Sequence, residues 1–342
     1  MPEVLRDHTT LRLGGPARSW VRATTEDEVV DAVRRADEAG EPVLVLAGGS
    51  NLVVSDEGFP GTVVEVATTG VRADHEGDDP TCGGVIVTVA AGEPWDPFVA
   101  QAVERHWVGL EALSGIPGSV GATPIQNVGA YGQEVSQTLA SVRVWDRRLR
   151  GHRSFAAADC GFGYRSSRFK ADPGRHIVLE VTFQLRQGEL GAPVTYAELA
   201  RTLGVEPGTR APMTDVRRAV LDLRTRKGMV LDAVDHDTWS AGSFFTNPVV
   251  AAAEVPDGAP AWPQPDGTVK TSAAWLIEQA GFGKGYGDGP VRLSGKHTLA
   301  LTNRGGAATT DLLALAREIR DGVEQRFAIR LVNEPVLVGV DL

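Results

Sequence analysis

The stretch SGIPGSVGATPIQNVGAYG, residues 114 to 132, has the most unusual composition in the chain. It holds five glycines and two prolines in nineteen residues and carries no charged side chain. So much glycine and proline argues against regular secondary structure throughout. A loop this long inside a compact domain is usually functional, and a surface loop would normally carry charge. These features predict a covered cradle built from backbone groups.

A second glycine-rich segment, AGGSN at residues 47–51, follows the apolar run EPVLVLA. Glycines here let backbone N–H groups approach a phosphate, and Ser50 and Asn51 add donors. Taken alone this signal is weak, because most strand–Gly–Gly turns bind nothing. Neither segment contains Gly-x-Gly-x-x-Gly or Gly-x-x-x-x-Gly-Lys-Ser/Thr. The chain therefore has two glycine-rich cradles that differ from those of the commoner nucleotide-binding folds.

Outward from these cradles, hydrophobic periodicity and capping residues predict both helices and strands. Thr24 or Thr25 is the expected cap of the first helix. Helices are predicted at residues 24–40, 94–106, 211–227 and 309–327. Strands are predicted at residues 41–47, 52–56, 61–67, 85–92, 139–146, 176–186 and 329–340. Residues 254–267 are expected to form a mobile surface loop, and the basic tract 143–153 an exposed hairpin or turn.

Length, charge and cysteine content restrict the class of protein. A chain of 342 residues is long enough for two or three domains. Its 34 basic and 44 acidic side chains give a net charge of −10, which argues against non-specific nucleic-acid binding. The apolar runs are too short to span a bilayer, and the N-terminus lacks the apolar region of a signal peptide. Cys82 and Cys160 lack metal-ligand spacing and are too few to staple the fold, so we expect a reducing cytoplasm.

The segment WSAGSFFTNP, residues 239–248, places Ser243 between a glycine and two phenylalanines. It is not the Gly-x-Ser-x-Gly turn of hydrolases. A buried serine that bonds its own backbone is the simplest explanation of such a position. The local sequence alone does not decide between that structural role and a chemical one.

Taken in order, AGGSNLVVSD, VTVAAG, GLEALSGIPGSVGATPIQNVGAYG, CGFGYRSSRFK, GSFFTNP and a late glutamate resemble the UDP-N-acetylenolpyruvoylglucosamine reductase family. The resemblance runs over almost the whole chain. These flavoenzymes of peptidoglycan-precursor synthesis reduce an enolpyruvyl ether to a lactyl ether. The resemblance implies an α+β protein with a two-lobed FAD-binding fold of the vanillyl-alcohol oxidase type and a C-terminal α/β substrate-binding domain. The implied divisions are FAD lobes at residues 1–66 and 67–215, a substrate domain at 216–330, and a last strand at 331–342.

The resemblance also implies three catalytic residues. Hydride delivery from the flavin to C3 of the enolpyruvyl group leaves C2 to be protonated, and Ser243 matches the family's proton donor. Arg165 would lie against the substrate carboxylate, and Glu334 would be the third member, here followed by Pro335 where the family commonly has valine. The residues implied for FAD are Ala47, Gly48, Gly49, Ser50, Asn51, Ser114, Gly118, Ser119, Gly121 and Ala122. Those implied for the substrate are Tyr131, Tyr164, Tyr196, Arg224, Lys227, Asn247 and Lys284.

FAD is expected to bind without a covalent link, because the first cradle contains neither His nor Cys. NADPH is the expected reductant, and the partner is a small molecule, UDP-N-acetylglucosamine enolpyruvate, with no nucleic acid, metal or membrane. Tyr196, in PVTYAELA, suggests the family branch whose extra loop places a tyrosine over the substrate. We expect a monomer. Two alternatives stay open: another non-covalent FAD oxidoreductase of the same fold, and a non-catalytic nucleotide-sugar-binding protein.

Overall fold

The computed structural model describes residues 3–75 and 84–342, so Cys82 lies outside the described residues. These residues form two compact units. The C-terminal unit contains residues 3–18, 49–60 and 226–342, and the sheet unit contains residues 19–48, 61–75 and 84–225. The expected lobe 1–66 is therefore shared between both units. The expected boundary at residue 216 falls inside a helix, α5 (Met213–Arg226).

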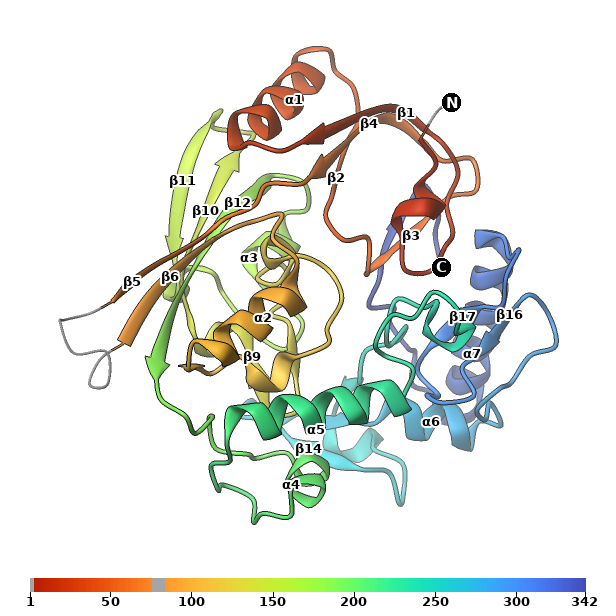
Figure 1. Ribbon diagram of the computed structural model, residues 1–342. Helices are drawn as coiled ribbons and strands as arrows, with labels where there is room; N and C mark the ends of the chain where they lie inside the picture. The colour runs from red at the N-terminus through yellow and green to blue at the C-terminus, as the bar shows by residue number, and fades with distance from the viewer. Residues whose placement is uncertain (1–2, 76–83) are drawn as a thin grey trace. The chain divides into compact units, whose positions relative to one another are not determined.

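The sheet unit is built around a mainly antiparallel sheet with strand order β11-β10-β12-β6-β5, and β7 pairs with the end of β12. Its valines alternate, so that Val85, Val87 and Val89 all point into one core. Helix α2 (Trp95–Glu104) packs Trp95 and Phe98 into that core and lies beside the sheet in Figure 1. The strands are β5 (Val71–His75), β6 (Gly84–Ala90), β7 (Trp107–Val108), β10 (Leu139–Asp146), β11 (Gly151–Ala156) and β12 (His176–Gln187).

A smaller sheet of β1 (Ala17–Ala23), β4 (Phe59–Val66) and β2 (Val43–Leu46) carries helix α1 (Glu26–Glu38). Thr25 caps this helix, since its hydroxyl accepts from the N–H of Glu28 and the Glu28 carboxylate accepts from the N–H of Thr25. The first predicted helix is thereby confirmed. Strands β2 and β4 are parallel, and β2 ends where the first glycine-rich segment begins.

The rest of the sheet unit is a small layer that carries several expected site residues. Helix α5 packs Val216, Val220 and Leu223 against Leu199 of a second helix. The remaining elements of this layer and of the adjoining loops are β8 (Gly129–Ala130), β9 (Gln133–Glu134), α3 (Arg168–Ala171) and α4 (Ala197–Leu203).

The C-terminal unit has its core along helix α7 (Thr309–Phe327), which occupies the predicted range. Leu312, Ala316 and Ile319 of α7 belong to one buried cluster with Phe244 and Phe245. Strand β18 (Val336–Val338) pairs in parallel with β3 (Leu52–Val54). The other elements are α6 (Ala273–Gln279), β13 (Val249–Val250), β14 (Ala261–Pro263), β15 (Val269–Thr271), β16 (Val291–Leu293) and β17 (Leu301–Asn303).

Two sequence predictions are wrong in detail. The final strand, expected at 329–340, is only β18, and Glu334 lies outside it. Pro335 has no N–H to donate at the point where the longer strand would have to continue. The expected loop 254–267 contains β14, which pairs with β15. The basic tract 143–153 is a hairpin of β10 and β11, as predicted.

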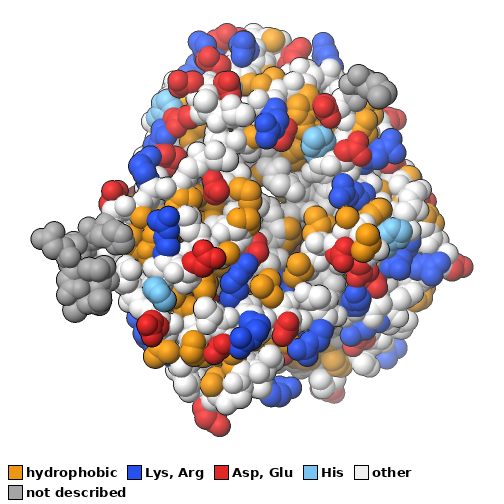
Figure 2. All heavy atoms as spheres, viewed as in Figure 1, with side chains coloured by type: hydrophobic (Ala, Val, Ile, Leu, Met, Phe, Trp, Pro, Cys, Tyr) orange, Lys and Arg blue, Asp and Glu red, His pale blue; other side chains and the backbone are white. Residues whose placement is uncertain are grey.

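Charged side chains of both signs are distributed over the face shown in Figure 2. Several arginines of the basic hairpin contact carboxylates, including Arg147 with Asp37. These pairings are typical of a solvated surface and not of a nucleic-acid patch. Within residues 3–75 and 84–342, no helix has both the length and the apolar character needed to cross a membrane.

Candidate active site

The glycine-rich tract 114–132 is held against the sheet unit by backbone and carboxylate contacts. The N–H of Gly121 donates to the carbonyl of Ala91 at 2.8 Å. The N–H of Gly115 donates to Oδ1 of Asp96, on α2, at 2.6 Å. Most of residues 111–124 are buried. The first part of the tract is thus covered, as the lack of charge predicted, whereas residues 125–132 are mostly half-buried or exposed.

Two positions of the sheet unit, Gly48 and Gly121, have no room for a side chain, and at Gly48 the two cradles approach each other. A Cβ added to Gly48 would lie 2.7 Å from Cα of Gly118, and one added to Gly121 would lie 2.5 Å from Cβ of Ala91. Beside this contact the Ser119 hydroxyl is buried and has no hydrogen-bond partner among the described residues. An unused buried donor beside closely packed backbone suits a phosphate oxygen. This part of the chain fits the pyrophosphate of FAD.

The first cradle continues into the C-terminal unit. Gly49 has φ +59°, and an added Cβ would lie 1.9 Å from the carbonyl oxygen of His8. Asn51 donates from Nδ2 to the carbonyl of Glu334 at 3.4 Å, and the N–H of Val336 donates to the carbonyl of Asn51 at 2.9 Å. These contacts fix the turn to the segment that carries Glu334.

The other residues expected at FAD differ in exposure. Ala47, Ser50 and Ala122 are half-buried. Ser114 is fully buried, and its hydroxyl donates to the carbonyl of Glu111 at 2.7 Å. The single O–H of Ser114 is thus already used within the protein. The hydroxyl could therefore accept a hydrogen bond from a ligand but could not donate one.

Ser243 and Glu334 lie on hydrogen-bonded segments of the C-terminal unit. The N–H of Glu334 donates to the carbonyl of Phe244 at 2.8 Å. Gly242 has φ +73° and open space around its Cα, so it permits the turn that presents the half-buried Ser243. Oγ of Ser243 lies 3.4 Å from Nε2 of His297. The serine hydroxyl therefore has a neighbouring imidazole, which the sequence analysis missed.

Arg165 belongs to the sheet unit, in a tight turn closed by the reciprocal backbone bonds of Gly163 and Ser166. Its own φ is +50°. Nη2 of Arg165 donates to the carbonyl of Gly129 at 3.2 Å, and Asn127 donates to the carbonyl of Gly163. The turn of Arg165 is thus attached to the glycine-rich tract. A left-handed conformation at a non-glycine residue is uncommon and is found where the surroundings hold it.

Tyr131, Tyr196 and Arg224 form a second group in the sheet unit. The rings of Tyr131 and Tyr196 meet edge to face with centroids 5.5 Å apart. Burial raises the pKa of Tyr131 to about 12, although the charge of Arg224 opposes the shift. Burial lowers the pKa of Arg224 to about 10, although Tyr131 and Asp96 favour its charged form. At neutral pH a protonated phenol and a buried cation therefore lie together, as an anionic ligand requires.

The remaining candidates are dispersed. Lys227 is half-buried, directly after α5. Asn247 accepts the N–H of Ala273 at 3.0 Å, at the start of α6. Lys284 is exposed in the loop between α6 and β16, and Tyr164 is 38% exposed with the Arg165 guanidinium 5.7 Å from its ring centre. The C-terminal unit thus holds Ser243, Glu334, Asn247, Lys227 and Lys284, and the sheet unit holds Arg165, Tyr131, Tyr164, Tyr196 and Arg224.

Sequence reasoning missed two residues next to these groups. Besides His297, it passed over Glu111, which is buried at 1% exposure within the 3₁₀ turn Glu111–Leu113. A single acid ahead of the glycine-rich tract, in GLEALSG, was the available signal. An acid between apolar residues is costly to bury unless donors surround it, which marks such a position for attention.

Comparison with known proteins finds similarity to the same reductase family along nearly the whole chain. The family model described as UDP-N-acetylenolpyruvoylglucosamine reductase, C-terminal domain, matches residues 233–338, and an FAD binding domain model matches residues 17–148. The chain is 59% identical to the UDP-N-acetylenolpyruvoylglucosamine reductase of Cutibacterium acnes, over 97% of this chain and 88% of that protein. It is 57% identical to the Thermobifida fusca protein of the same name, over 99% of this chain and 97% of that one.

A solved structure agrees with the sequence comparison. The UDP-N-acetylenolpyruvylglucosamine reductase of Thermus caldophilus matches with a TM-score of 0.65 at 27% identity, over 99% of this chain and 98% of that chain. The expected α+β fold, with an FAD-binding part and a C-terminal reductase domain, is confirmed. With this identity maintained along nearly its whole length, the chain belongs to the UDP-N-acetylenolpyruvoylglucosamine reductase family.

Proposed function

We propose that this chain reduces the enolpyruvyl ether of UDP-N-acetylglucosamine enolpyruvate to UDP-N-acetylmuramate, with NADPH as reductant and non-covalent FAD as cofactor. Family membership supports the reaction, and one contact supports the residue assignment. The N–H of Glu334 donates to the carbonyl of Phe244 at 2.8 Å, so the chain segments that contain Glu334 and Ser243 are hydrogen-bonded to each other.

When bound, FAD supplies a carrier that takes hydride from NADPH and delivers it to C3 of the substrate. Oγ of Ser243 then gives its proton to C2. His297, 3.4 Å from that oxygen, orients the hydroxyl and restores its proton. A serine is a weak acid, but an adjacent basic carbon needs only a nearby and oriented donor. Glu334 lies on the adjoining segment as a further polar group of the same site.

Arg165 is proposed to contact the substrate carboxylate and stabilise the charge that develops there. Its turn is attached to the glycine-rich tract through Gly129, so the guanidinium would be held relative to the cofactor cradle. Tyr131, Tyr196 and Arg224 are proposed to hold the nucleotide-sugar diphosphate. Tyr196 would be the tyrosine of the extra-loop branch. The remaining assignments are Tyr164, Lys227, Asn247 and Lys284 at the substrate, and the residues of the two cradles at FAD.

We also propose a monomeric enzyme of peptidoglycan-precursor synthesis in the reducing cytoplasm, because two cysteines are too few to cross-link a chain of this size. The 59% identity with the Cutibacterium acnes reductase argues against the two alternatives, another FAD oxidoreductase of this fold and a non-catalytic nucleotide-sugar-binding protein.

Purified protein tests this function directly. It should be yellow, and acid precipitation should release the chromophore into the supernatant, because no covalent link is proposed. NADPH should bleach the colour anaerobically, and UDP-N-acetylglucosamine enolpyruvate should restore it. Chromophore that stays in the pellet would exclude the non-covalent assignment. Bleached protein that only oxygen reoxidises would point to an oxidase instead.

A further inference from the structure

Glu111 is a carboxylate buried among N–H donors. Its Oε1 accepts from the N–H of Ala192 at 2.6 Å and from Nε2 of Gln133 at 2.9 Å. Its Oε2 accepts from the N–H of Gly109 at 2.7 Å. Burial of a charged group is strongly unfavourable unless such donors replace water. The three contacts make Glu111 the meeting point of three chain segments.

Two of those segments carry the paired tyrosines. Gln133 follows Tyr131 by two positions, and Ala192 precedes Tyr196 by four. Gln133 is itself fixed, because its Oε1 accepts from the N–H of Ala112 at 2.7 Å. The segments also approach closely: a Cβ on Gly132 would lie 2.4 Å from Oγ1 of Thr195. The geometry of the tyrosine pair thus depends on how these two segments are joined.

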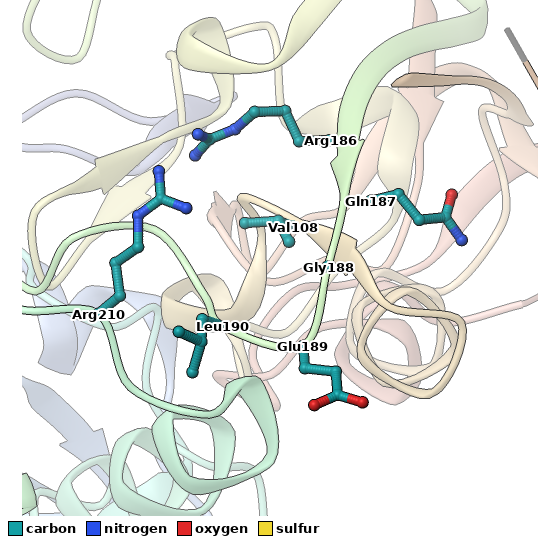
Figure 3. Close-up of a pocket in the computed structure, with 7 residues that line it drawn as sticks. All are labelled: Val108, Arg186, Gln187, Gly188, Glu189, Leu190 and Arg210. Carbon is teal, nitrogen blue, oxygen red and sulfur yellow. The ribbon is translucent and has the colours of Figure 1, made fainter. Parts of the chain in front are cut away.

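Residues 186–190, which precede the Tyr196 segment in the chain, line a pocket of about 430 Å³ together with Val108 and Arg210. Figure 3 shows the Arg186 and Arg210 side chains extending across this pocket, while Glu189 points away from it. Leu190 is 47% exposed there. The backbone of residues 191 and 194 is hydrogen-bonded to residues 208, 209 and 211, and Val194 is buried in one cluster with Leu199 and Val220. Glu111 adds a buried side-chain attachment to this segment, through the N–H of Ala192.

We propose that Glu111 is a positioning residue: it holds the Tyr196 segment against the Tyr131 segment so that both tyrosines contact the nucleotide sugar. The proposal rests on the function proposed above, since that function assigns the tyrosines to the substrate. Because Glu111 is only 1% exposed, it would not contact the substrate or cofactor directly. It acts through the backbone of Ala192 and the side chain of Gln133.

The test is a double-mutant cycle between Glu111→Gln and Tyr196→Ala. A glutamine has one acceptor oxygen in place of two, so either the N–H of Gly109 or both the N–H of Ala192 and Nε2 of Gln133 lose their acceptor. Glu111→Gln should raise the substrate KM by on the order of tenfold, as expected when a buried donor is left unsatisfied, with a smaller change in kcat. The double variant should have a KM no higher than that of Tyr196→Ala alone. The Ala192 amide should also exchange its hydrogen faster in Glu111→Gln.

A matched control is Asp146→Asn. Asp146 is another fully buried carboxylate of the same unit, accepting from the N–H groups of Arg148 and Leu149 and from Arg175. It should lower stability without changing KM, in both backgrounds. If Glu111→Gln does not fold, Gly191→Ala replaces it, because the added Cβ would lie 2.7 Å from Oε1 of Glu111 and would displace the segment.

The outcomes separate the two claims. If Glu111→Gln has the KM of wild type, or if its effect multiplies that of Tyr196→Ala, Glu111 stabilises the fold and positions nothing. The same holds for Gly191→Ala if it must be used. A wild-type enzyme that does not turn over the enolpyruvyl substrate overturns the proposed function, and this proposal with it.

Discussion

At the scale of single residues, Gly49 has a left-handed backbone and also lacks room for a Cβ. Comparison with Gly40, which has only the left-handed backbone, separates the cost of backbone strain from the cost of the steric clash. Gly40, after α1, has φ +66° but no atom near an added Cβ, whereas the Cβ of an alanine at position 49 would meet the carbonyl of His8. Gly40→Ala should lower the free energy of unfolding by about 1 kcal/mol, from backbone strain alone. Gly49→Ala should lower it further and reduce the flavin content of the purified protein. Urea unfolding and the flavin-to-protein absorbance ratio measure both, and equal behaviour of the two variants would contradict the account.

The buried phenol of Tyr131 should make the free energy of unfolding depend on pH. Its pKa is raised by burial to about 12 from 10.0, so the folded state retains a proton that the unfolded state loses in between. Its contribution to stability is therefore complete below pH 10 and is lost as the pH rises towards 12. The difference in unfolding free energy between wild type and Tyr131→Phe should be constant near neutral pH. Above the lower pKa it should shrink by about 1.4 kcal/mol per pH unit. Urea titrations at a series of pH values test this, and a difference that stays constant through that range would refute the burial of the phenol.

At the scale of elements, Asp96 connects α2, the glycine-rich tract and α5. Its carboxylate accepts from the N–H of Gly115 and forms a two-point contact with Arg217 at 2.6 and 2.9 Å. Burial alone would raise the pKa of Asp96, but Arg217 and the Gly115 N–H bring it below its usual value. Asp96→Asn should weaken the tract and lower FAD affinity severalfold.

The control for Asp96 is Asp31→Asn. Asp31 pairs with Arg34 on the exposed face of α1, at 2.8 Å. Exposed pairs of this kind contribute little, so this variant should bind FAD as wild type does. Flavin release followed by fluorescence compares the two. An Asp96→Asn variant with wild-type FAD affinity would show that the carboxylate does not support the cradle.

Elements were predictable where local signals agreed. Helix α7 occupies its predicted range because its apolar face is regular over the whole length, and a capping threonine, expected at Thr24 or Thr25, marked the start of α1. The final strand was overestimated because an apolar run looks the same whether or not its backbone is paired. Pairing of β18 depends on β3, which lies far away in the sequence.

At the scale of the whole molecule, the glycine-rich tract indicated a covered cradle, but only the ordered set of motifs indicated the family. Contacts between distant segments were not predictable. His297 lies beside Ser243 across 54 positions, and Ala192 donates to Glu111 across 81. No periodicity or spacing encodes such pairs, because tertiary packing creates them. The resemblance to the family supplied the candidate functional residues that local patterns could not.

The most direct test of the account follows the flavin colour of wild type and Ser243→Ala in anaerobic stopped-flow experiments. NADPH should bleach both proteins at similar rates, because that step needs no proton at C2. Addition of UDP-N-acetylglucosamine enolpyruvate should restore the colour rapidly in wild type. In Ser243→Ala it should do so at least roughly 10²-fold more slowly, as expected for loss of a general acid. An alanine variant that regains colour at the wild-type rate would contradict proton donation by Ser243, and a wild type that never regains it would contradict the reductase function itself.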